Sequence, residues 1–339
     1  MTDADLIDWL DAHALALDTG TTASAGLLPR LAAAGLLARG VAVAQGGAGG
    51  DLGDAVEAVA LLARHSLTAA WVLTCQHSFI GLLLAASNIG LREYLLPALL
   101  EGTQAGCVPG LGMPGPISAA LQAHDTGRGW RLQGELPEVS NLMRDGHLLA
   151  APAVFEGSPS LVLLSSDQDG LHKAPWADLP AARGACTANV AVTQVYFRED
   201  ELLHGDAQAL ADALRPTWLA LQAGLGLGLA EAALLAVSQA AREAGEPPSR
   251  ALASQQAAVA QARRGLLDGL RLVRAFTPAG PLLRWREHNA ELASTGVALE
   301  AAGAHHRGEP RCAQALRRQR EAQWLAERWL PRSLSSMDA

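Results

Sequence analysis

The sequence predicts an α+β protein of several domains: an N-terminal helical domain, a central antiparallel β-barrel and a C-terminal four-helix bundle. Three observations lead to this prediction. Apolar residues at helical spacing fill both ends of the chain, short strand-like runs fill the middle, and clusters of Gly and Pro separate these parts. We expect domain boundaries near residues 102 and 206, which gives domains 1–102, 103–206 and 207–339.

The composition is that of a folded protein with a large core. The chain has 339 residues, of which 50% are hydrophobic and 18% are charged. A mainly disordered chain is therefore excluded. The formal net charge of -8 argues against a nucleic-acid partner, because no excess of basic residues is available to neutralise phosphates.

The N-terminal part has two signs of helix. Leucines recur at helical spacing, and a Gly-rich break precedes Asp51, which stands where an N-cap residue is expected. The helix that begins there is predicted to run through Leu61 and Leu62. The earlier apolar positions are Leu6, Trp9, Leu10, Leu27, Leu28, Leu31 and Leu36.

The middle part changes character after a segment, residues 109–116, that is rich in Pro and Gly and cannot form a helix. The strand-like runs that follow are 130–133, 147–151, 160–164 and 190–197. Gly and Asp separate these runs, and no helical segment lies between them. This pattern favours antiparallel strands in a small barrel or sandwich over a parallel sheet.

The third part is helical again. Pro247 and Pro248 break one long helix from the next, and Pro278 with Pro281 makes a second break. The segment 224–228 alternates Gly and Leu, but it follows no strand and lacks the spacing of a phosphate loop, so close helix packing is the better explanation. Leucines exceed a single helical stripe and predict an oligomer centred on the bundle: Leu225, Leu227, Leu229, Leu234 and Leu235.

Several features predict a cytoplasmic protein without a membrane span or a metal. The N-terminus is acidic, unlike a signal peptide, and the four cysteines form no CxxC pair. Residues 66–91 carry no charge but are too polar for a spanning helix, so we expect buried helices. His305 and His306 are adjacent and have no third ligand at metal spacing, while His77 is predicted to be a hydrogen-bonded core or cleft residue.

Local motifs resemble those of the acyl-CoA dehydrogenase family, in family order and over most of the chain. Residues 44–50 resemble its PxxYGGxG turn, 127–134 its GdGyxlnG hairpin, and 179–205 its last barrel strands. Ser140 and Asn141 lie where the family has WITN. Residues 240–245 are similar to its RxxFG helix end. The strings Leu299 to Gly303 and Arg320 to Ala322 are similar to its QxxGG and RDA pair.

The resemblance implies FAD as the cofactor. Ser140 and Asn141 would bind the flavin ring, since a serine retains the hydroxyl of the family's threonine. A serine at a strand end also serves to satisfy a turn, and this reading stays open. Glu138 replaces the family's tryptophan beside the ring, and residues 109–116 replace a family loop that supplies hydroxyls to the cofactor.

The resemblance assigns three further cofactor contacts in the C-terminal part. Arg242 would bind the pyrophosphate of a neighbouring subunit, Gln256 or Gln255 would lie near the adenine end, and Gly303 would let the backbone approach the adenosine. A solvated arginine in an ordinary helix is an equally good reading of Arg242 alone.

The family's catalytic glutamate has no counterpart. The position after the RDA-like string is Trp329, and the position at the start of the first bundle helix falls near Pro216. Neither can accept a proton. Glu327 is a weak catalytic candidate, because two residues along a helix correspond to a rotation of about 200°.

Three functions follow from these residues. The first is FAD-dependent oxidation of an acyl thioester, carried by CoA or by a carrier protein, with weak or altered activity. The second is a flavin-dependent monooxygenase on the same fold, because such relatives lack the base. The third is a non-catalytic homologue that serves as a binding or assembly partner. The resemblance also implies a homodimer or homotetramer and an electron-acceptor flavoprotein.

Overall fold

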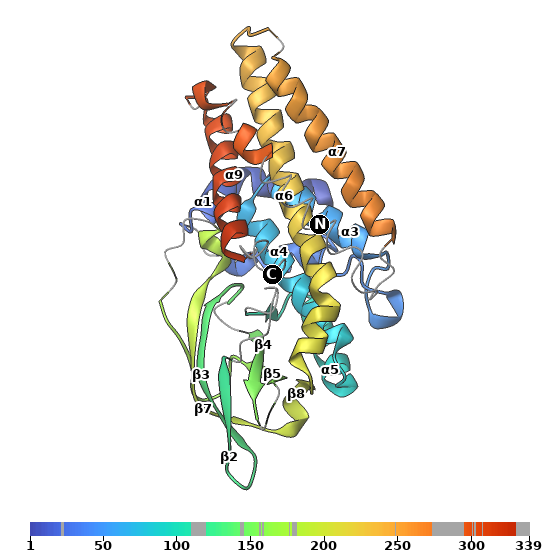
Figure 1. Ribbon diagram of the computed structural model, residues 1–339, viewed down its shortest axis with the longest axis vertical. Coiled ribbons are helices and arrows are strands. Elements are labelled where there is room, and N and C mark those ends of the chain that lie inside the picture. The colour runs from blue at the N-terminus through green and yellow to red at the C-terminus, as the bar shows by residue number, and fades with distance from the viewer. Residues whose placement is uncertain are drawn as a thin grey trace, which may run out of the picture.

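A computed structural model describes residues 1–329 apart from 22–23, 110–119, 143–145, 156, 158, 176, 178–181, 248, 273–294, 300, 302 and 307. The side chains of residues 25, 271–272, 305 and 324–329 also lie outside the description. Figure 1 shows a sheet at one end of the molecule, long helices at the other, and the N-terminal helices packed around their junction.

The N-terminal helices begin at side-chain caps. Thr2 and Asp5 form a reciprocal capping box at the first helix. Asp51 accepts a hydrogen bond from the Gly53 N–H at 2.7 Å and forms a second box with Asp54, which confirms the predicted N-cap. The helices are α1 (Asp3–Asp18), α2 (Leu27–Ala33), α3 (Leu52–Ala63), α4 (Leu67–Ala85) and α5 (Ile89–Leu100).

The strand-like runs of the middle part all lie in one sheet. The strand order is β6-β7-β3-β2-β4-β5-β8, and β1 pairs with β4 off this path. The predicted hairpin is the β2–β3 pair, which is antiparallel with Asp125 opposite Trp130. The strands are β1 (Ala105–Cys107), β2 (Leu121–Asp125), β3 (Trp130–Val139), β4 (His147–Val154), β5 (Pro159–Ser165), β6 (Leu171–Lys173), β7 (Ala188–Phe197) and β8 (Leu202–His204).

The sheet departs from the expected antiparallel barrel in two respects. Within the described residues, β6 and β8 lie at the two ends of the path and do not pair with each other, so the sheet is open. β4 pairs in parallel with both β1 and β2. The cause is topological: β3 folds back from β2, and the chain then crosses to the far side of β2, where β4 runs in the same direction as β2.

The helical end of the molecule consists of α6 (Ala207–Glu243), α7 (Arg250–Leu272) and α9 (Pro310–Trp329). The break between α6 and α7 contains Pro247, as predicted. Residues 295–299 form a helical segment. The break expected at Pro278 and Pro281, and most of the expected fourth helix, lie outside the described residues.

Helix α6 is central because two of its glycines allow close contact with α3. A Cβ atom at Gly224 would lie 2.7 Å from the Val56 carbonyl oxygen, and one at Gly228 would overlap the Ala60 carbonyl. No larger residue fits without separating the helices. The prediction that these glycines serve helix packing is confirmed.

Two helices, α4 and α6, are long and apolar enough to cross a membrane by length and composition. The most apolar window of each helix is 83% and 61% buried, respectively, within this chain. They are therefore core helices, as expected for residues 66–91. The same packing weakens the leucine argument for an oligomer, because Leu225, Leu227 and Leu229 are buried by this chain's own helices. Leu235, which is 66% exposed, still fits that argument.

Candidate active site

Backbone strain gathers where β3 ends. Four residues other than glycine have positive φ there: Glu138 and Asn141 at 50° and 66°, and Ala182 and Cys186 at 48° and 52°. Such conformations cost about 1–3 kcal/mol each and persist where the surroundings enforce them, often at functional sites. These strained residues mark the end of β3 as a candidate functional site.

Hydrogen bonds join the two strained segments. The Asn141 N–H donates to the Ala185 carbonyl at 2.8 Å, and the Leu142 N–H donates to the Cys186 carbonyl at 3.1 Å. The Ser140 and Thr187 hydroxyl oxygens lie 2.8 Å apart. These contacts fix the segment after β3 against the segment before β7.

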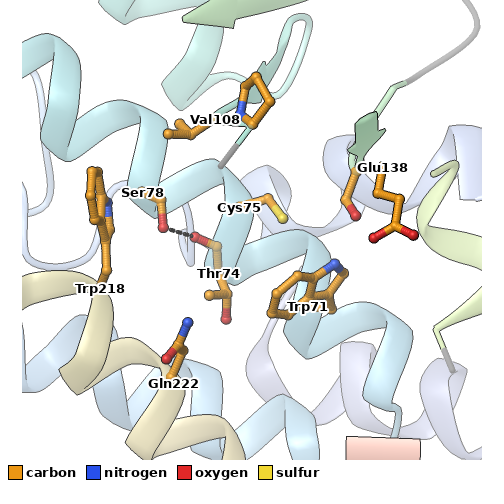
Figure 2. Close-up of a pocket in the computed structure, with 10 residues that line it drawn as sticks. Trp71, Thr74, Cys75, Ser78, Val108, Glu138, Trp218 and Gln222 are labelled. Carbon is orange, nitrogen blue, oxygen red and sulfur yellow. Dashed lines mark hydrogen bonds between the residues drawn. The ribbon is translucent and has the colours of Figure 1, made fainter. Parts of the chain in front are cut away.

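A pocket lies between this end of the sheet, α4 and α6, and the described part of it has a volume of about 60 Å³. This volume holds a few water molecules or a small substituent of a ligand. The residues that line it are Trp71, Thr74, Cys75, Ser78, Val108, Pro109, Glu138, Ser140, Trp218 and Gln222. Figure 2 shows Trp218 and Gln222 projecting from α6 toward the face of α4 that carries Thr74 and Ser78.

The hydroxyl groups of α4 use their hydrogens within the helix. Thr74 Oγ1 donates to the Ala70 carbonyl at 2.8 Å, and Ser78 Oγ donates to the Thr74 carbonyl at 2.7 Å. Their lone pairs therefore remain as acceptors. Gln222 on α6 adds a further acceptor, because its Oε1 is buried and has no hydrogen-bond partner among the described residues.

Burial keeps two titratable groups of α4 neutral. Burial raises the pKa of the Cys75 thiol to about 12, so this pocket residue is a thiol and a poor nucleophile near neutral pH. Burial lowers the pKa of His77 to about 4, against a smaller opposing effect of its hydrogen bond to Leu36. His77 Nε2 lies 3.1 Å from the Leu36 carbonyl oxygen, so His77 is a hydrogen-bonded core residue.

The two residues at the WITN position point to different places. Ser140 is half-buried and lines the pocket. Asn141 is 2% exposed, and its amide donates to Gln76 Oε1 and to the Gly106 carbonyl, both at 3.1 Å. The Asn141 side chain thus joins β1 and α4 in the core, while the assignment of Asn141 to the cofactor stays a prediction.

The predicted cofactor residues of the C-terminal part lie far from this pocket within one chain. Arg242 and Gln256 are exposed near the turn between α6 and α7. This turn lies at the upper end of the bundle in Figure 1. Gly303 is buried, and a Cβ atom there would lie 2.7 Å from Val237 and 2.9 Å from Leu316. Packing between α6 and α9 therefore explains this glycine without a cofactor.

Helix α6 contributes no carboxylate to the described pocket. Its lining residues are Trp218 and Gln222, one helical turn apart, whereas Pro216 is buried in the helix. The backbone of α9 stays helical through Trp329, so Glu327 lies in its last turn, and its side chain is outside the described residues. Among the described lining residues, Glu138 carries the formal charge.

Sequence reasoning missed most of the pocket lining. Trp71, Cys75, Trp218 and Gln222 were not singled out as site residues. The available signal was spacing: Trp71, Thr74, Cys75 and Ser78 share one face of α4. That face is recognised as a site only once the sheet end is known to lie against it.

Solved structures share this architecture over nearly the whole chain. Butyryl-CoA dehydrogenase from Megasphaera elsdenii superposes with a TM-score of 0.77 at 15% identity, covering 95% of this chain and 94% of that chain. A chain of the electron transferring flavoprotein structure from Acidaminococcus fermentans gives a TM-score of 0.78 at 15% identity, with the same coverages. FkbI, described for biosynthesis of the methoxymalonyl extender unit of Fk520, gives 0.76 at 18% identity, with coverages of 95% and 94%.

The fold is therefore that of the acyl-CoA dehydrogenases, as the sequence motifs predicted. No protein-family model and no curated protein matches the chain by sequence. At 15–18% identity, structural similarity establishes the fold. The chemistry depends on the residues that line the pocket.

Proposed function

We propose that this chain is a flavin-dependent oxidoreductase of the acyl-CoA dehydrogenase type, acting on an acyl thioester carried by CoA or by a carrier protein. The observation that carries the proposal is the position of Ser140. Its hydroxyl lines a pocket between the sheet end, α4 and α6, in a chain with the acyl-CoA dehydrogenase fold. A hydroxyl at such a strand end is suited to hydrogen-bond the polar edge of a flavin ring.

The hydroxyl pair fits this role. Ser140 and Thr187 share one hydrogen bond of 2.8 Å, which uses one of their two hydrogens. When Thr187 donates to Ser140, the Ser140 hydrogen is available to an acceptor in the pocket. The described hollow of about 60 Å³ is smaller than a flavin ring, so the ring would lie outside it, with its polar edge toward Ser140.

The chain's own residues supply binding and exclusion of water. Ser140 would hold FAD, which when bound accepts a hydride from the substrate. Trp71 and Trp218, 8% and 4% exposed, form apolar walls that keep water out. Trp218 and Gln222 of α6 cannot take a proton as a carboxylate does, so we expect weak or altered dehydrogenase activity.

The remaining parts of the proposal concern assembly. Arg242 and Gln256 lie at an exposed end of the bundle, where they could reach only the cofactor of a neighbouring subunit. We therefore propose a cytoplasmic homodimer or homotetramer that passes electrons to a flavoprotein acceptor. The contact of Gly303 with the adenosine stays a prediction, although packing alone accounts for a glycine at this position.

A second function, flavin-dependent monooxygenation, is favoured by one observation. No carboxylate from α6 lines the described pocket, and a monooxygenase does not need the base of a dehydrogenase. A non-catalytic homologue is the third alternative. The visible spectrum of the purified protein separates them: absence of flavin absorbance contradicts both enzymes, and anaerobic bleaching by an acyl-CoA supports the dehydrogenase over the monooxygenase.

A further inference from the structure

We propose that the pocket between α4, α6 and the end of β3 binds a small ammonium group, so that the substrate is an acyl thioester bearing an amine. The identification of the ligand as a thioester rests on the proposed function. The ammonium site itself rests on the side chains that line the pocket.

The oxygens around the pocket act as acceptors. Thr74 Oγ1 and Ser78 Oγ use their hydrogens on carbonyls of their own helix, at 2.8 Å and 2.7 Å. Each retains lone pairs. A ligand group that donates hydrogen bonds is therefore matched to this face of α4, and a group that only accepts is not.

Gln222 provides the most specific argument. Its Oε1 is buried and lacks a hydrogen-bond partner among the described residues. A buried acceptor without a donor is destabilising, and in native structures such an atom usually meets a donor from the protein, a water molecule or a ligand. A donor on a bound ligand would satisfy it, and an ammonium carries three.

One carboxylate and two indole rings in the lining favour a cationic ligand over a neutral hydrogen-bond donor. Glu138 carries the formal charge among the described lining residues, and none of these residues is Lys, Arg or His. Trp71 and Trp218 present two indole rings to the same pocket, and Figure 2 shows them on different sides of it. Carboxylate and indole faces together are the groups that attract an organic cation.

The size of the hollow suits a small group. The described part, about 60 Å³, has room for an ammonium group and a short alkyl stem. A methyl group in the same position would leave the acceptors without donors. Discrimination against such an apolar isostere is therefore built into the pocket.

The test uses three small probes on the intact wild-type protein, titrated by ligand-observed NMR. Propylammonium carries charge and donors, 1-propanol carries an uncharged hydroxyl that donates and accepts, and tetramethylammonium carries charge without a donor. We expect propylammonium to bind at least tenfold more tightly than either of the other two. Equal binding of 1-propanol and propylammonium would overturn the proposal without the need for any variant.

Two substitutions then locate the site. Glu138→Gln removes the charge and Gln222→Leu removes the acceptor, and each should weaken propylammonium binding about tenfold or more. Glu135→Gln is the matched control, because Glu135 is an exposed carboxylate on the same strand. A loss in Glu135→Gln equal to that in Glu138→Gln would place the cation elsewhere and contradict the proposal.

Flavin absorbance, recorded on the same samples, separates this inference from the proposed function. A colourless protein that still prefers propylammonium, with the expected effects of both substitutions, would support the ammonium site and contradict the proposed flavin enzyme. A yellow protein without that preference would support the flavin enzyme and contradict the ammonium site.

Discussion

Arg318 on α9 donates through Nε to the carboxylate of Asp18, at the end of α1, over 2.8 Å. The two side chains are 8% and 0% exposed, and 300 residues separate them in the sequence. The other carboxylate oxygen of Asp18 accepts from the Ser66 hydroxyl at 2.7 Å and from the Thr68 N–H at 2.9 Å. One carboxylate therefore joins the first helix, the start of α4 and the last helix.

Removing the charge of Asp18 should destabilise the protein strongly. Asp18→Asn leaves the Arg318 guanidinium buried without a counter-ion, which typically costs about 3–5 kcal/mol. Urea unfolding followed by circular dichroism measures this change. Asp200→Asn is the control, since Asp200 and Arg198 form a pair in which both side chains are 63% exposed, and it should change stability by less than about 1 kcal/mol. Similar losses in both variants would contradict the role given to Asp18.

Stability should fall as pH rises through the titration of Glu321. Burial raises the pKa of Glu321 to about 7, with Arg317 acting against the shift and Asp18 adding to it. The unfolded chain loses this proton near the ordinary value of 4.5, so between these two values the folded state binds the proton that the unfolded state has released. The free energy of unfolding, measured from pH 5 to pH 8, should decline less in Glu321→Gln than in wild type. An unchanged slope would show that Glu321 is ionised in the folded protein throughout.

Two glycine-to-alanine substitutions in helices should have opposite effects. Gly228→Ala drives a Cβ atom into the Ala60 carbonyl and should lower the midpoint of unfolding. Gly81→Ala meets nothing within 4 Å in α4 and should stabilise by about 0.5–1 kcal/mol through helix propensity. Thermal unfolding of both variants beside wild type checks the difference. A neutral Gly228→Ala would contradict the close packing of α6 against α3.

Loss of the Ser140 hydroxyl should weaken retention of flavin. Ser140→Ala removes one hydrogen bond, worth about 0.5–1.5 kcal/mol, and should raise the dissociation constant for FAD by about two- to tenfold. Fluorescence of released flavin on dilution measures it. Ser160→Ala, which removes a hydroxyl bonded to the Gly205 carbonyl at 3.0 Å on the sheet, is the control and should leave retention unchanged.

Ordinary acyl-CoA dehydrogenase activity should be close to background even with saturating FAD. General-base catalysis contributes roughly 10²–10⁴-fold, and the described face of α6 in the pocket offers Trp218 and Gln222 in place of a base. An electron-acceptor dye assay with short, medium and long acyl-CoAs is run on wild type and Glu327→Gln. Turnover abolished by the substitution would identify Glu327 as the base. Robust turnover that survives it would assign that role to another residue.

Local signals in the sequence predicted the helices and the four longest strands, β3, β4, β5 and β7. Asp51 was recognisable as an N-cap because capping depends on a residue and its near neighbours, and Pro247 marked the end of α6 for the same reason. The parallel pairing of β4 with β2 was not predictable in this way. It depends on which side of β2 the chain crosses to after β3, and no short stretch of sequence encodes that choice.

The side chains of the pocket were also only partly predictable from short stretches of sequence. The WITN-like position directed attention to both Ser140 and Asn141, yet neighbours along the chain point in different directions, and Asn141 turns into the core to meet Gln76. Gln222 carried no local signal at all. Its importance comes from Oε1, which is buried without a hydrogen-bond partner among the described residues, and this is a property of the assembled structure.

The close contact of α6 with α3 has a consequence for synthesis on the ribosome. Arg64, just after α3, pairs with Glu231 of α6, which follows it by 167 residues. Chain elongation proceeds at about 5–20 residues per second, so roughly ten to thirty seconds pass between synthesis of α3 and synthesis of the part of α6 that covers it. During that interval the apolar face around Val56 and Ala60 is exposed to the cell, so nascent chains of this protein should be substrates for chaperones that hold hydrophobic segments.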